Sequence, residues 1–146
     1  MLLETEEGLF VSVGSDHTDR IIEQSSFVAS KRAFPKIVAP MVWPVSELVG
    51  QWDQLILRSW ITGEGKRSLY QERSLGAILP PSDLLALVPA ADRGHGLILF
   101  SGTVPSLVPA PQTGWWRFEG DLCAEDGAIL ARCEYDYEAG PRPRRP

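Results

Sequence analysis

Residues 14–20 read Gly-Ser-Asp-His-Thr-Asp-Arg and hold the densest group of side chains that could do chemistry. His17 adjoins Asp16, and an imidazole so placed is a candidate general base. Lys31 follows on a stretch that alternates as a strand would, so burial is expected to desolvate its ammonium group. The alternatives are plainer: Asp16 is an ordinary turn residue and Lys31 a surface lysine.

Strand signals dominate the chain around these residues. Apolar and β-branched runs predict strands at 9–13, 27–31, 54–61, 68–71 and 97–100. The last run is apolar throughout, which is typical of a strand buried on both faces. Helix signals are fewer and predict a turn capped by Thr18 and helices at 45–51 and 81–88. We therefore expect a mainly β (α+β) fold with a few short helices.

The last hairpin is the most clearly marked element. Asp126-Gly127 is a strong signal for a two-residue turn, and that turn would pair Trp116 with Tyr137. One face of the hairpin is then apolar. The other face is expected to hold two opposite-charge pairs, Arg117 with Asp136 and Asp121 with Arg132.

The same register has two further consequences. It sets Glu119 opposite Glu134, and two carboxylates there could accept a guanidinium from elsewhere in the chain. It also puts Cys123 and Cys133 on opposite faces, which argues against a disulfide between them. The alternative is a solvated face held by its own ion pairs.

Length and composition indicate one globular domain, which we place at 1–138, followed by a disordered Pro- and Arg-rich tail at 139–146. The 146 residues carry a formal net charge of -5, which argues against nucleic acid or an anionic membrane as a partner. No stretch is long and apolar enough to span a bilayer, and the acidic N-terminus is not a signal peptide. Two histidines and two cysteines without ligand spacing exclude a zinc finger. We expect a cytoplasmic protein.

Several blocks resemble the fumarylacetoacetate hydrolase-like superfamily, over roughly residues 8–138. Residues 14–20, with Ala29-Ser30-Lys31 and Pro35, are similar to its N-D-x-[ST]-x-R and A-K-S/G-F-D-T-x-x-P segments. Residues 97–105 resemble D-L-I-x-T-G-T-P, and Gln71 followed by Ser74 resembles Q-x-G-x-T. An uncharacterised bacterial branch, a domain of unknown function, shares the G-S-D-H-T-D-R block and also S-K-x-x-x-P-K.

The resemblance implies a β-roll or sandwich, often dimeric, that acts on small 2-oxo acids or 1,3-dicarbonyl compounds as a hydrolase, decarboxylase, isomerase or hydratase. It also implies a divalent ion, Mg²⁺, Mn²⁺ or Ca²⁺, held by three carboxylates of which Asp16 is the third. Lys31 matches an active-site lysine that would neutralise an enolate or a ligand carboxylate. Arg20 matches an arginine that orders the site through a carboxylate, and the hairpin register makes Glu119 the candidate partner.

Three further residues match substrate-binding positions. Gly102 and Thr103 match a loop that presents a backbone N–H and a hydroxyl to a carboxylate or oxyanion, with a simple turn as the alternative. Gln71 matches a substrate contact, although Arg73 replaces the glycine that should follow it. His17 stands where the superfamily usually has an aromatic or aliphatic residue, so a catalytic role for it would be particular to this branch.

One part of the superfamily pattern is missing. Its other two metal carboxylates form an E-x-E pair upstream, whereas Glu4-x-Glu6 has the right letters in what aligns as a turn. A single carboxylate binds magnesium poorly, so the ion would be weakly held or absent unless Glu4 and Glu6 substitute. We therefore expect either a metal-dependent enzyme or an inactive, N-terminally truncated remnant that binds an organic acid or self-associates. Open sheet edges favour self-association, and the homodimer is the expected form.

Overall fold

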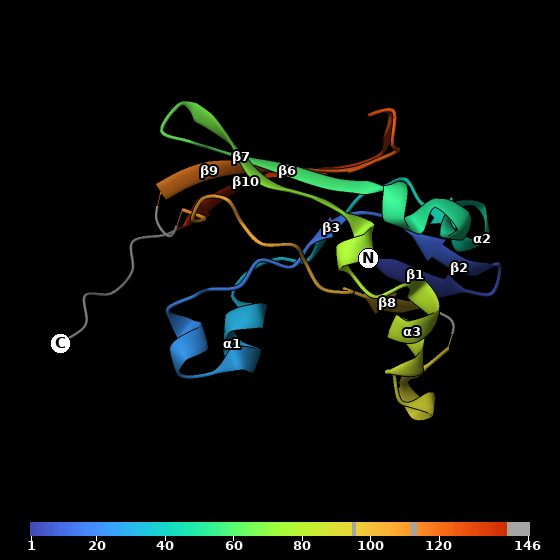
Figure 1. The fold of residues 1–146 in the computed structure, drawn as a ribbon. Helices are drawn as coiled ribbons and strands as arrows, with labels where there is room; N and C mark the ends of the chain where they lie inside the picture. The colour runs from blue at the N-terminus through green and yellow to red at the C-terminus, as the bar shows by residue number, and fades with distance from the viewer. Residues whose placement is uncertain (95, 112–113, 140–146) are drawn as a thin grey trace.

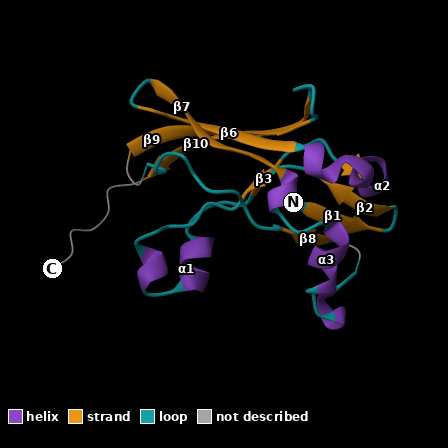
Figure 2. Cartoon of the chain, viewed as in Figure 1, coloured by secondary structure: helices purple, strands orange, loops and turns teal. Residues whose placement is uncertain are grey.

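The computed structural model describes residues 1–94, 96–111 and 114–139, which form two four-stranded antiparallel sheets (Figures 1 and 2). One sheet has the order β5-β2-β1-β8, with β1 at Leu2–Thr5, β2 at Gly8–Val11, β5 at Trp43–Pro44 and β8 at Leu97–Leu99. The other has the order β10-β9-β6-β7, with β6 at Ile56–Gly63, β7 at Lys66–Ser74, β9 at Gly114–Cys123 and β10 at Ile129–Ala139. The mainly β expectation is confirmed.

Short helices and one small ladder connect the sheets. The helices are α1 at Phe27–Arg32, α2 at Val45–Leu48 and α3 at Pro81–Ala86, and the 3-10 turns are η1 at Ile22–Gln24, η2 at Val49–Gln54, η3 at Leu75–Ala77 and η4 at Ala90–Asp92. The ladder pairs β3, Gly14–Ser15, with β4, Ile37–Val38. Helices predicted at 45–51 and 81–88 are present, but the α-helices end earlier, at Leu48 and Ala86. No helix of the described segments is long and apolar enough to cross a membrane.

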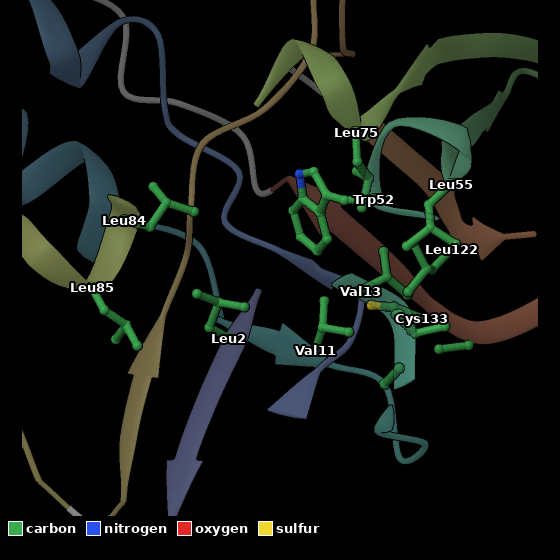
Figure 3. Close-up of a cluster of buried hydrophobic side chains, with 13 residues drawn as sticks. Leu2, Val11, Val13, Trp52, Leu55, Leu75, Leu84, Leu85, Leu122 and Cys133 are labelled. Carbon is green, nitrogen blue, oxygen red and sulfur yellow. The ribbon is translucent and has the colours of Figure 1, made fainter. Parts of the chain in front are cut away.

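A buried apolar cluster joins the two sheets (Figure 3). Leu2 and Val11 reach it from the first sheet, Leu122 and Cys133 reach it from the second, and Trp52 fills it from η2. Each buried side chain of leucine size contributes roughly 1.5–3 kcal/mol relative to exposure. This cluster therefore fixes how the two sheets lie against each other.

The β9–β10 hairpin has the predicted register but not the predicted turn. Trp116 pairs with Tyr137 as expected. Ala124 and Ala128 close a three-residue loop in which Gly127 has φ +87, and a bulge between Ile129 and Ala131 then restores the register. A glycine with positive φ ending such a loop is a common alternative to the two-residue turn, so the local signal was correct while the loop length was wrong.

The charged face of the hairpin is also as predicted. Arg132 forms a two-pronged ion pair with Asp121, with both N···O distances 2.7 Å, and Arg117 lies 3.4 Å from Asp136. Glu119 does face Glu134, but the two carboxylates have separate cations, Arg67 and Arg117 respectively. Repulsion between them is thereby offset.

Two predicted strands differ in the structure. Residues 27–31 form helix α1, because the Ser26 side chain accepts a hydrogen bond from the Ala29 backbone and begins a helix. Residues 97–100 supply β8, but this strand lies at a sheet edge and Ile98 is 48% exposed. The tail predicted at 139–146 lies outside the described residues except for Ala139, which ends β10.

The Asp121–Arg132 pair gives a stability prediction. Asp121 is 1% exposed, so replacing Arg132 by methionine would leave a buried carboxylate without its cation. We expect a loss of about 2 kcal/mol in the free energy of unfolding, measured by urea denaturation. Arg117→Met is the matched control, because its partners Glu134 and Asp136 lie in solvent, and its loss should be much smaller. Equal losses would contradict this account.

Candidate functional site

A cavity of about 1440 Å³ is lined by most of the site residues that the sequence predicts. It is bounded by the loop after β3, by α1, by β6 and β7, and by residues 100–106. Seven of the eight nominated residues line it: Asp16, His17, Arg20, Lys31, Gln71, Gly102 and Thr103. Glu119, the eighth, does not line it. Segments far apart in the sequence thus share one hollow.

Asp16 is held by two lysines. Its Oδ2 accepts a hydrogen bond from Lys31 Nζ, and its Oδ1 lies 2.6 Å from Lys36 Nζ. The β3–β4 ladder explains this, because Asp16 directly follows Ser15 and Lys36 directly precedes Ile37, and those two residues are paired. Burial alone would raise the pKa of Asp16, but the two ammonium groups lower it below its usual value. Asp16 is therefore an ionised carboxylate with one ammonium group close to each oxygen, although Oδ1 has the ion pair alone and no hydrogen bond of good geometry among the described residues.

His17 lies in a cage of aromatic rings formed by Phe34, Tyr70, Trp116, Phe118 and Tyr135. Burial in this cage, helped by the positive charge of Arg20, lowers the pKa of His17 to about 4. The imidazole is therefore neutral at pH 7. A neutral imidazole can accept a proton at one nitrogen and donate one at the other.

The two ring nitrogens of His17 differ in their hydrogen-bonding partners. Nδ1 lies 2.6 Å from Ser15 Oγ and 2.7 Å from the Tyr135 hydroxyl, which are themselves 2.8 Å apart. Within the described part of the chain, the buried Nε2 has no hydrogen-bonding partner, and neither has Nε1 of neighbouring Trp116. Ser15 and Tyr135 thus orient the ring through Nδ1 and leave Nε2 as a buried nitrogen without a partner among the described residues.

Gln71 makes hydrogen bonds to the loop that contains Gly102 and Thr103. Its Nε2 donates to Thr103 Oγ1 at 2.8 Å and to the Val104 carbonyl at 2.5 Å, and its Oε1 accepts from Ser59 Oγ at 3.1 Å. Gln71 is only 8% exposed. The structure therefore gives it a clear role as the anchor of residues 103–104, while a direct contact with substrate remains a prediction.

The expected pairing of Arg20 with Glu119 is wrong. Arg20 binds Glu23 at 2.8 Å, one helical turn away, and Glu119 binds Arg67 at 2.8 Å. Arg20 belongs to the turn at η1, which Asp19 caps by accepting from the Ile21 and Ile22 amides. The predicted pairing is wrong because Arg67, on strand β7 of the same sheet, is the cation that pairs with Glu119.

With Lys31 and Lys36 in place, the residues around Asp16 do not fit a divalent ion with oxygen ligands. Among the residues that the structure describes, no three His, Cys, Asp or Glu side chains are gathered to hold a metal. Glu4, offered as a substitute ligand, lies on β1 and pairs with Arg93 at 3.7 Å. Both carboxylate oxygens of Asp16 already meet ammonium groups. A metal would have to displace those cations and find further ligands.

Sequence reasoning missed Ser15, Lys36 and Tyr135. Tyr135 shares the apolar face of the hairpin with Tyr137, but its contact with His17 spans 118 residues of sequence. Lys36 carried a local signal, since it stands in the Pro-Lys pair that follows the Ser-Lys motif. The signal for Ser15 was its place beside Asp16.

Comparison with known proteins gives a family but no activity. Residues 1–131 match the family described as Protein of unknown function (DUF2848). The chain belongs to this family. No curated protein and no solved structure matches it. The chemistry of the DUF2848 cavity must therefore be argued from its own residues.

The Gln71 anchor gives a second prediction. Gln71→Leu removes the donor that holds residues 103–104 and leaves Ser59 without its acceptor. We expect a loss of about 2 kcal/mol in unfolding free energy and faster proteolysis within residues 101–106. The neighbouring Glu72→Gln serves as control, because Glu72 is exposed. Unchanged proteolysis in Gln71→Leu would contradict the anchoring role.

The pKa of His17 gives a third prediction. Because its folded pKa of about 4 is below its unfolded value of 6.5, the unfolded chain binds more protons between these values. Stability is therefore fully present above pH 6.5 and is lost as the pH falls towards 4, by up to about 3 kcal/mol. Urea unfolding at pH 7 and pH 4.5 should show a smaller difference for His17→Gln than for the wild type. Identical differences would rule out this role for His17.

Proposed function

We propose that this DUF2848 chain is a fumarylacetoacetate hydrolase-like domain that binds a small 2-oxo acid or 1,3-dicarbonyl compound in the cavity and acts on it. The supporting observation is that seven of the eight nominated residues line one hollow of about 1440 Å³. That volume accommodates a small organic acid with ordered water.

The charges around Asp16 support an anionic ligand. Lys31 and Lys36 bring two positive charges to a single carboxylate, and Arg20 is balanced separately by Glu23. One positive charge is therefore left over at the cavity wall. A ligand carboxylate or an enolate oxygen would satisfy it, since both Lys31 and Lys36 line the cavity.

The neutral His17 supports proton transfer. Chemistry at the carbon beside a carbonyl requires a base that is unprotonated at working pH, and burial keeps this imidazole neutral. Ser15 and Tyr135 orient it through Nδ1. In this proposal Nε2 exchanges the proton, Lys31 holds the developing negative oxygen, and the segment at Gly102 and Thr103 contacts the ligand carboxylate.

The two lysines also favour a second candidate, which is binding without turnover. In the superfamily a divalent ion polarises the substrate carbonyl, whereas here both oxygens of Asp16 are engaged by ammonium groups. A cavity that binds an organic acid but lacks an electrophile would serve as a receptor domain. The two candidates share the ligand and differ in catalysis.

Isothermal titration with pyruvate tests the shared ligand. We expect Lys31→Met to weaken binding at least about tenfold, because it removes the surplus positive charge beside Asp16 at the cavity wall. Lys66→Met, at the exposed first residue of β7, should bind as the wild type does. If the wild type shows no binding at millimolar pyruvate, with or without added Mg²⁺ or Mn²⁺, the proposed ligand class is wrong.

Turnover of oxaloacetate separates the two candidates. The enzyme reading expects decarboxylation or enolisation that falls in His17→Gln while pyruvate still binds. Binding of pyruvate without any turnover of oxaloacetate, in the presence or absence of Mn²⁺, would exclude the enzyme and favour the receptor domain.

The homodimer stays a prediction. β8 is a sheet edge, and Ile98 on it is 48% exposed. Phe27 and Val28 of α1 are also largely exposed, at 62% and 58%. Unpaired edges and exposed apolar side chains are typical of surfaces that associate. Light scattering on the purified chain measures its mass, and a mass of 16.1 kDa at all concentrations would exclude the dimer.

A further inference from the structure

The ammonium group of Lys36 lies within a cradle of four oxygen atoms. Besides Asp16 Oδ1 at 2.6 Å, it meets the backbone carbonyls of Lys31 at 2.5 Å, Phe34 at 3.4 Å and His17 at 3.5 Å. One carboxylate and three carbonyls form an oxygen set of the kind that hard cations prefer. The ammonium group of Lys36 thus occupies a position that suits a cation.

The four oxygens of this cradle come from residues on two other segments of the chain. The Lys31 and Phe34 carbonyls lie at the C-terminal end of α1, where backbone carbonyls lack intrahelical donors. Asp16 and the His17 carbonyl come from the loop after β3. A positive charge between the two segments satisfies both, and the β3–β4 ladder delivers Lys36 there because it directly precedes Ile37.

We propose that Lys36 is a built-in cation, a tethered ammonium that occupies the cation position beside Asp16 in place of a metal ion. It neutralises Asp16, ties the loop of residues 16–17 to α1 and leaves the charge of Lys31 for a ligand in the cavity that both lysines line. Lys36 is a positioning residue in this arrangement. The inference goes beyond the ligand proposed above, since it concerns cations only and holds whichever organic acid the cavity takes.

The charge balance makes the consequence of removing Lys36 specific. Without its ammonium, the cradle would keep four oxygens and only Lys31 as a counter-charge. An empty oxygen cradle of this kind should admit a small cation from solution. A merely structural lysine would leave no such site behind when it is replaced.

Manganese titration of Lys36→Met tests the proposal, with Lys66→Met as matched control. Methionine has a similar length and no charge, so the cradle is vacated with little change in packing. We expect wild type and Lys66→Met to show no Mn²⁺ site tighter than millimolar. Lys36→Met should melt at a lower temperature, bind Mn²⁺ or methylammonium at least about tenfold more tightly than the wild type, and regain thermal stability when either is added.

Lys36→Arg and the wild type keep the test decisive if Lys36→Met fails to fold. Lys36→Arg retains the charge and should remain folded without a Mn²⁺ site. In the wild type, Mn²⁺ should not broaden the NMR signals of residues 16–17. Broadening there, tight Mn²⁺ binding by the wild type, or a Lys36→Met protein that neither loses stability nor responds to cations would each overturn the proposal. Failure to bind pyruvate would leave it untouched.

Discussion

The ion pairs of Asp16 with Lys31 and Lys36 are the interaction on which the site depends. Helix α1 lies at the end of the molecule away from α3 (Figure 1) and exposes Phe27 and Val28, so apolar packing holds it only in part. The two lysines, one in α1 and one just before β4, fasten it to the loop after β3. These pairs are partly shielded from solvent, so each contributes more than an exposed pair would.

A second constraint comes from the β9–β10 hairpin, which supplies the environment of His17. Its apolar face carries Trp116, Phe118 and Tyr135, whose rings surround the imidazole. The same alternation that makes this face apolar therefore also desolvates His17 and keeps it neutral. Register, packing and protonation state are linked here, because a slip of one residue would turn these aromatic side chains to the other face.

Features with local signals could be predicted from the sequence, and those set by distant contacts could not. The hairpin register and the helix at Pro81 follow from turn and cap residues close by. Helix α1 was missed because Phe27, Val28 and Ala29 look like a strand, whereas the deciding contact is the cap at Ser26. The partner of Glu119 was misjudged because Arg67 competes for it across the sheet, and such competition has no trace in local sequence.

The net charge of the whole chain contrasts with the positive charge that Lys31 and Lys36 leave beside Asp16. The formal net charge is -5, so the chain as a whole does not attract small anions. The wall of the cavity at Lys31 and Lys36 has the opposite sign, and it is partly withdrawn from water, where charges interact more strongly than in bulk solvent. Under the proposed function an organic acid is drawn to this wall rather than to the chain as a whole, and the contrast in charge supports that proposal.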